Sequence, residues 1–114
     1  MTLSPREFAA AFSSHDFEPT FSQIAEAVVW RMPGAAPIEG RDAMIDACRA
    51  TVAALAGTEI ERNRFFVVDG GDAVVVDTLT VYRDNGEQST VASCDIYEFE
   101  NDRLLALTSY NIDL

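Results

Sequence analysis

One carboxylate set into an apolar strand is the residue of this chain best placed to do chemistry. Asp95 lies in the strand-like segment 92–99 and shares one face of it with Val91, Tyr97 and Phe99. An ionised carboxylate among apolar side chains is costly, so it must be paired, hydrated or kept protonated. Because desolvation raises the pKa of a carboxyl group, we predict Asp95 to be a catalytic acid/base residue. The alternative is a structural carboxylate held by polar neighbours, for which the candidates are Ser93, Thr78, Ser109 and Arg31.

The register of the strands around Asp95 follows from one turn. An Asn-Gly pair at 85–86 between two strand-like runs is the strongest short-range signal for a β-hairpin. With a two-residue loop, counting back from the turn places Thr78 opposite Ser93 and Val76 opposite Asp95. Side chains alternate along a strand, so these residues share one face. The same face carries Tyr82, Thr80, Ser89 and Val91.

The opposite face of this hairpin is also largely apolar. Its residues are Val75, Asp77, Leu79, Val81, Thr90, Ala92, Cys94 and Ile96. Because both faces must be covered, we expect helices on one face and a second copy of the chain on the other. The sequence thus predicts a homodimer that forms through the sheet.

Three helices are expected in the first half of the chain. A capping box at 4–7 with Pro at the first helical position predicts a helix over about 5–14. Asp16 can cap a second helix, and a third spans about 42–55, with Gly57 after its end. The second helix rests on apolar residues at helical spacing, namely Phe17, Phe21, Ile24 and Val28.

Strands dominate the second half. After a short strand over 28–32 and a loop to Gly40, the strand-like runs are 60–68, 73–83, 88–100 and 103–112. Helices followed by a meander indicate an α+β fold. We expect a single domain over residues 1–114, in which three N-terminal helices pack on a curved antiparallel sheet. Together they should form a cone with an interior cavity.

Composition excludes several classes of function. The net charge is −11 and all eight basic residues are Arg, so the chain lacks the basic surface that nucleic acids and anionic membranes require. No apolar run approaches the ~20 residues that span a bilayer, and the N-terminus has no signal-peptide pattern, so we expect a cytoplasmic protein. We expect Cys48 and Cys94 to be free thiols in a reducing compartment. No metal-ligand motif and no Gly-rich phosphate loop occur, so we predict no metal and no cofactor.

Three segments of the chain resemble the SnoaL-like branch of the nuclear transport factor 2-like superfamily. They are 8–16 ahead of the second helix, 38–44 at the start of the third, and 95–100 near the end. The resemblance covers essentially the whole chain and implies the cone fold with its pocket. It implies no single activity, because this fold hosts enzymes, binding proteins and structural modules.

Carried over residue by residue, the resemblance leaves Asp95 as the main match to a catalytic site. The protonated oxyanion-hole Asp of ketosteroid isomerase corresponds to Asp95, nine residues after Gly86. The Tyr of that site falls at Phe8, and its general base falls at Arg31 or Met32. We therefore reject ketosteroid isomerase activity.

Other enzymes of the superfamily match in part. The polyketide cyclases have an acid/base Asp at a position like Asp95, but the His that assists there has no evident counterpart. The Asp-Arg-Asp set of the epoxide hydrolases looks incomplete, since one acid falls near Ser109. The dehydratases use paired His residues, and this chain has only His15, which we interpret as interacting with a helix C-terminus.

Aromatic and small polar side chains should form the wall of the cavity. Trp30 is a candidate platform for a ligand, with core packing as the alternative. If a four-residue loop precedes the last strand, as the resemblance suggests, Ser109 and Asn111 face the cavity; a two-residue loop would place Thr108 and Tyr110 there. The predicted ligand-binding residues are Phe12, Phe21, Trp30, Met32, Thr78, Ser93, Tyr97, Leu107, Ser109 and Asn111.

The expected partner is an apolar or aromatic small molecule, and whether the protein is an enzyme stays open. If it is one, Asp95 would perform cofactor-free acid/base chemistry such as isomerisation, cyclisation or dehydration. The alternative is a non-catalytic ligand-binding or dimerisation module with a vestigial cavity. The missing Tyr and general base favour that second interpretation, because a lone acid has no second titratable group to share the acid/base steps.

Overall fold

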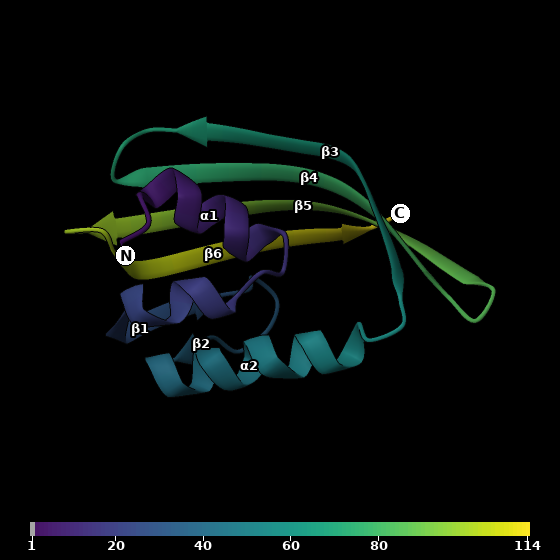
Figure 1. Ribbon diagram of the computed structural model, residues 1–114, viewed down its shortest axis with the longest axis horizontal. Coiled ribbons are helices and arrows are strands. Elements are labelled where there is room, and N and C mark those ends of the chain that lie inside the picture. Colours follow the sequence, from purple (N-terminus) through teal and green to yellow (C-terminus); the bar gives the residue numbers. More distant parts are fainter. Residues whose placement is uncertain (1) are drawn as a thin grey trace.

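The computed structural model describes residues 2–114 and shows helices packed on one side of a curved, open sheet (Figure 1). The elements in chain order are α1 (Pro5–Ser13), the 3₁₀-helix η1 (Glu18–Gln23), β1 (Ile24–Arg31), β2 (Ile38–Glu39), α2 (Arg41–Ala54), β3 (Glu59–Asp69), β4 (Ala73–Asp84), β5 (Glu87–Glu100) and β6 (Arg103–Asp113). The predicted α+β class, with three helices on a curved sheet, is confirmed. Within residues 2–114, no helix combines the length and apolar character needed to cross a membrane.

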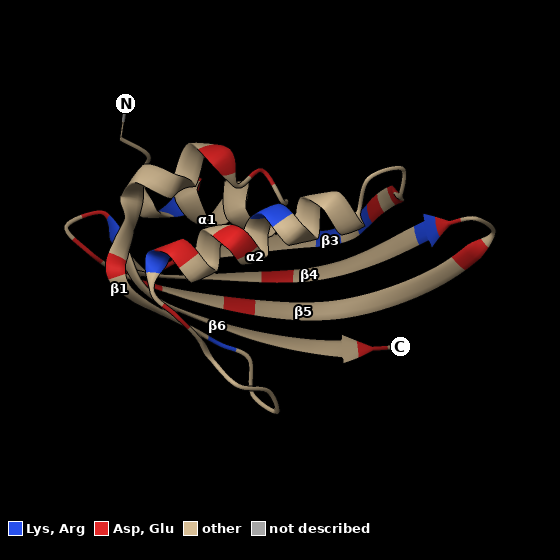
Figure 2. Ribbon diagram, turned by 90° about the horizontal axis from the view of Figure 1, so that it is seen from below, with Lys and Arg blue, Asp and Glu red and all other residues tan. Residues whose placement is uncertain are grey.

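The six strands lie in the order β2-β1-β6-β5-β4-β3, and neighbouring strands are antiparallel except β1 and β6. Figure 2 shows α1 and α2 on one side of the curved sheet, which we call the concave face. The other side, the convex face, is covered by no helix of residues 2–114. From the register, the concave face carries Val76, Thr78, Asp95 and Ser109, and the convex face carries Phe66, Asp77, Cys94 and Tyr110.

Helix α1 begins at the predicted capping box. Ser4 Oγ accepts a hydrogen bond from the backbone N–H of Glu7 at 3.1 Å, and Glu7 Oε1 accepts one from the backbone N–H of Ser4 at 2.9 Å. Phe8 and Phe12 are buried four residues apart on one face of the helix. Their rings pack edge-on against Phe99 and Trp30 at 5.3 and 5.5 Å between centroids. This packing fixes the C-terminal end of α1 over the concave face.

The prediction of the second helix is wrong in extent. Only the short helix η1 forms, and the chain becomes strand β1 at Ile24 rather than at Val28. Both residues are buried, because a spacing of four puts two side chains on one face of a helix and equally on one face of a strand. Pairing with β6, in which Trp30 lies opposite Leu107, decides for the strand. The short strand β2, which pairs with β1, lies where the sequence predicts only a loop.

The predicted register of the β4–β5 hairpin is confirmed. Thr78 lies opposite Ser93 and Val76 lies opposite Asp95, with the two-residue turn at 85–86. The two turn residues have φ angles of 50° and 80°, the left-handed pair that a type I′ turn requires. Asp95 therefore points to the concave face, as the turn chemistry alone predicts.

The connection between β5 and β6 differs from the predicted four-residue loop. The turn has two residues, 101–102, but the register shifts by one residue farther along the strands. Phe99 pairs with Leu104 and Glu98 pairs with Ala106, so Leu105 is the extra residue of a β-bulge. Because a one-residue shift reverses the face of every later side chain, the bulge has the effect expected of the longer loop. The cavity-side residues of β6 are accordingly Ser109 and Asn111.

Candidate functional site

A pocket of about 370 Å³, which we call the cavity, opens between the C-terminal end of α1, α2 and the concave face of the sheet. Its volume falls in the range of ~300–1,000 Å³ typical of small-molecule sites. Four strands, both α-helices and the loop after α1 contribute side chains. The lining residues are Phe12, Ser13, His15, Phe17, Trp30, Thr51, Thr78, Thr80, Tyr82, Val91, Ser93, Asp95, Leu107, Ser109, Asn111 and Asp113.

Asp95 reaches this cavity from the middle of β5. Its Oδ2 accepts a hydrogen bond at 2.9 Å from Ser13 Oγ, at the end of α1. Burial raises the pKa of the Asp95 carboxyl above its ordinary value, and hydrogen bonds with Ser109 and Ser13 offset part of that increase. The net direction is upward, as expected for a desolvated carboxyl. Arg31, a candidate partner from the sequence, instead lies exposed on the sheet with its guanidinium 3.9 Å from Glu98.

A chain of hydroxyls extends from Asp95 into the core. Ser13 Oγ lies 2.6 Å from the hydroxyl of Tyr97, which is fully buried. Since the single hydroxyl proton of Ser13 is donated to Asp95, the Tyr97 hydroxyl must donate to Ser13. Burial, with the nearby Asp95 charge second, raises the pKa of Tyr97 well above its ordinary value, so Tyr97 stays a phenol. The Tyr97 hydroxyl thus orients the Ser13 hydroxyl, which in turn donates to Asp95.

Polar side chains continue along the concave face beyond Asp95. Ser93 Oγ donates to Asn111 Oδ1 at 2.7 Å, and these residues lie opposite one another on β5 and β6. The indole Nε1–H of Trp30 donates to Ser109 Oγ at 3.0 Å. Because this donor is already used, Trp30 offers a ligand its ring rather than its N–H. The wall therefore combines fixed aromatic surface with a few oriented polar groups.

Three of the ten predicted ligand-binding residues do not line the cavity. Tyr97 is fully buried behind Ser13, and Met32 lies in the loop after β1. Phe21 lies on η1 and lines an outer cleft against α2, because the expected second helix is cut short. The residues that do line it are Phe12, Trp30, Thr78, Ser93, Leu107, Ser109 and Asn111.

The structure adds lining residues that the sequence does not single out. Thr80, Tyr82 and Val91 could have been chosen from the hairpin register, because they share the face of Asp95. Ser13 carries no local signal, since its partner is 82 positions away. The others are His15, Phe17, Thr51 and Asp113.

A larger groove of about 570 Å³ lies beside the tip of the β4–β5 hairpin and shares Tyr82 with the cavity. Its carboxylates, Asp84 and Glu87, are exposed, and its one half-buried titratable group, Tyr82, also lines the cavity. We therefore assign the candidate chemistry to the cavity around Asp95. Across residues 2–114, no three His, Cys, Asp or Glu side chains gather in a way that could hold a metal ion.

Helices on the concave face of a curved open sheet define a nuclear transport factor 2-like α+β fold. Within this class, the chain belongs to the SnoaL-like domain family, which matches residues 6–107. No curated protein matches the sequence.

Solved structures of three similar proteins share the fold. A protein of unknown function from Cytophaga hutchinsonii, described as NTF2-like, is 29% identical, with a TM-score of 0.80 over 92% of this chain and 93% of that one. An LEH-like epoxide hydrolase from M. tuberculosis is 16% identical, with a TM-score of 0.64 over 96% of this chain and 84% of that one. A candidate polyketide cyclase from Xanthomonas campestris pv. campestris is 16% identical, with a TM-score of 0.67 over 90% and 83%. At such identities the last two likenesses concern the fold alone.

Proposed function

We propose that this protein binds an apolar or aromatic small molecule in the cavity and that Asp95 exchanges a proton with it. The observation that carries the proposal is the Asp95 carboxyl, whose pKa is raised by burial in a cavity of ligand size. Phe12, Phe17 and Trp30 form the aromatic part of the cavity wall. Asp95 is the group in this wall to which a C–H or O–H of the ligand would transfer its proton. Proteins described as an epoxide hydrolase and a candidate polyketide cyclase share this fold, which is compatible with an enzymatic role.

The proposed chemistry needs no cofactor. As a carboxylate, Asp95 would take a proton from one atom of the ligand and return it to another, so that the enzyme ends in its starting state. Isomerisation, cyclisation and dehydration all fit such a proton shuttle. The hydroxyls of Ser13 and Ser109 would keep the Asp95 carboxyl oriented in the cavity.

The test is a binding screen combined with a single substitution. The indole N–H signal of Trp30 is unique in this chain, so NMR titration with small aromatic compounds reports binding in the cavity directly. For a compound that binds, Asp95→Asn should abolish any turnover while leaving the fold intact. Asp77→Asn on the convex face is the matched control and should change neither binding nor turnover.

Three outcomes would contradict parts of the proposal. If no compound moved the Trp30 signal, the cavity would not be a binding site. If ligands bound but turnover was never seen, the protein would be a non-catalytic binding module. If turnover was seen and survived Asp95→Asn, the protein would be an enzyme in which Asp95 is not the catalytic residue.

We also propose that the convex face is the interface of a homodimer. Phe66 and Ile112 on this face are 52% and 62% exposed, and Val68 and Tyr110 are also exposed. A contiguous apolar face of this kind is typical of a protein interface. Two charged groups on this face neutralise each other, because Arg64 pairs with Asp77 at 2.8 Å.

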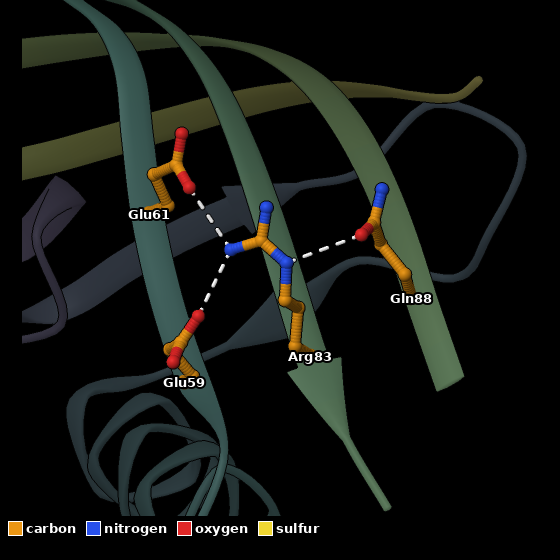
Figure 3. A network of polar contacts seen from close by, with 4 residues as sticks. All are labelled: Glu59, Glu61, Arg83 and Gln88. Carbon is orange, nitrogen blue, oxygen red and sulfur yellow. Dashed lines mark hydrogen bonds and ion pairs between the residues drawn. The ribbon is translucent and has the colours of Figure 1, made fainter. Parts of the chain in front are cut away.

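The edge of the convex face carries polar side chains that also pair with one another. Arg83 Nη1 donates to Glu59 and Glu61, each at 2.9 Å, and Arg83 Nε donates to Gln88 at 3.1 Å (Figure 3). An apolar centre with a polar rim is the usual anatomy of an interface between proteins. Because the rim groups already hydrogen-bond to one another, we expect the apolar centre to provide most of the binding free energy of the dimer.

Light scattering at micromolar concentration tests the dimer. We expect the wild type to have twice the mass of one chain and Phe66→Glu/Ile112→Glu to have the mass of one. Val52→Glu, which changes an equally exposed apolar residue on α2, should remain dimeric. A monomeric wild type would contradict the proposal.

A further inference from the structure

The loop after α1 places the single histidine of the chain in the cavity wall. His15 is half-buried and lines the cavity, with its ring near Phe17 and Tyr82 at 5.7 and 6.4 Å between centroids. Its φ angle is 67°, in the left-handed region that glycine prefers. The backbone N–H of His15 donates to Phe12 O at 3.0 Å, which ties this conformation to the end of α1.

Arg62 on β3 fixes the protonation pattern of the imidazole. One Nη2 group of Arg62 lies 2.9 Å from the carbonyl oxygen of Ser14 and 3.0 Å from His15 Nδ1. A guanidinium has only donors, so Nδ1 must be the acceptor, and the proton of the neutral ring must be on Nε2. No carboxylate of residues 2–114 forms an ion pair with Arg62, so its charge opposes a second proton on the ring. Burial, and then the Arg62 charge, lower the pKa of His15 and keep the ring neutral.

The Nε2–H is a donor without an acceptor. Within the part of the chain that the structure describes, no residue accepts a hydrogen bond from it, and no buried side-chain nitrogen or oxygen lacks a partner. The donor is therefore accessible. We propose that His15 is a binding residue whose Nε2–H donates to a carbonyl oxygen of an uncharged ligand in the cavity. Arg62 is then a positioning residue that acts through His15.

The charge of the surroundings selects the class of ligand. Besides His15, the ionisable residues that line the cavity are Tyr82, Asp95 and Asp113. With two carboxyl groups in the wall and a net charge of −11, the cavity disfavours a ligand carboxylate or phosphate. A neutral carbonyl offers His15 an acceptor without that repulsion. This inference rests on the proposed function, because it assumes that the cavity binds a ligand.

The first test needs no ligand. Long-range ¹H–¹⁵N NMR of the single histidine should show the Nε2–H tautomer at neutral pH in the wild type. Arg62→Met should shift the ring toward a mixture of tautomers, a change that loss of packing alone would not produce. An Nδ1–H tautomer or an imidazolium in the wild type would overturn the inference.

The second test compares two probes of similar shape, the aromatic ketone 1-tetralone and its parent hydrocarbon tetralin, by titration of the Trp30 indole N–H. His15→Gly suits this test because glycine accepts the left-handed backbone. We expect this variant to lose about five- to tenfold in affinity for 1-tetralone, the equivalent of one net hydrogen bond, and less than about twofold for tetralin. Asn101→Gly is the matched control, since Asn101 also has a left-handed backbone, with a φ angle of 51°, and does not line the cavity; its affinity for both probes should equal that of the wild type.

The outcomes separate the two levels of the proposal. If the wild type binds the probes and His15→Gly weakens both equally, or neither, the cavity is a binding site but His15 is only part of its wall. If the wild type binds neither probe, both the inference and the cavity proposal behind it fail for this class of ligand.

Discussion

The two faces of one sheet satisfy their charged groups in opposite ways. On the concave face, Asp95 is held by Ser13, 82 positions earlier in the chain. On the convex face, Asp77 is paired with Arg64, only 13 positions away on the neighbouring strand. Strand alternation alone sends residues to one face or the other. The buried Asp95 therefore depends on packing between distant segments, whereas the more exposed Asp77 finds its partner on the neighbouring strand.

Core packing should show the largest difference between the faces. Phe8→Ala empties a fully buried site under α1 and should destabilise the fold by about 3–5 kcal/mol. Phe66→Ala removes a half-exposed ring and should cost the monomer less than about 1 kcal/mol, while weakening the dimer. Urea denaturation at several protein concentrations separates the two effects. Equal, concentration-independent losses would erase the proposed distinction.

The hydroxyl chain behind Asp95 should come next in size. Ser13→Ala leaves the buried Tyr97 hydroxyl without its partner and should destabilise the protein by about 1–3 kcal/mol. Adding Tyr97→Phe removes the orphaned group, so the double variant should be more stable than the sum of the two single effects predicts. On the convex face, Arg64→Met breaks an exposed ion pair and should cost under about 1 kcal/mol. If the effects of Ser13→Ala and Tyr97→Phe on the free energy of unfolding were strictly additive, the two hydroxyls would not be energetically coupled.

The dependence of stability on pH should report the burial of Asp95 on the concave face. Because the pKa of Asp95 is raised in the folded state, the folded protein binds more protons than the unfolded chain between the two pKa values. Stability should therefore fall as pH rises from the ordinary Asp pKa through the raised folded value, and then level off. Asp95→Asn should flatten this decline and gain stability near neutrality relative to the wild type. A wild-type curve that rises over this range, or an unchanged slope in the variant, would contradict the direction of the shift.

Thiol reactivity should show the smallest contrast. Cys48 is a buried residue of α2, and burial raises the pKa of its thiol to about 12, so it should resist labelling in the native state. Cys94 is half-buried on the convex face and should react. If that face is the dimer interface, labelling of Cys94 should be several-fold faster in Phe66→Glu/Ile112→Glu than in the wild type, measured by mass spectrometry. Equal rates would count against the interface.

The fold was predictable wherever a local signal fixed it. The capping box starts α1, and the Asn-Gly turn sets the register that brings Asp95 and Thr78 to one face. The β5–β6 connection shows a limit, because the sequence did not reveal the bulge at Leu105. The boundary between η1 and β1 shows another, because the spacing of Ile24 and Val28 fits a helix and a strand equally.

The candidate site was predictable in part for the same reason. Residues on the hairpin could be assigned from strand alternation, and Ser93 and Thr78 do line the cavity. Tyr97 lies on the correct face, yet the depth of its burial depends on how α1 packs over it. His15 was interpreted as a helix-end residue, because nothing near it in the sequence points to Arg62.

By itself, the sequence determined the α+β class, the first helix, the hairpin register and the choice of Asp95 as the desolvated acid. Those features depend on turn chemistry, capping and alternation, which act over a few neighbouring residues. Only the tertiary structure decided that Ser13 holds Asp95 and that Arg62 orients His15. Such pairs join segments 82 and 47 positions apart, and their geometry exists only after helix and sheet have packed together.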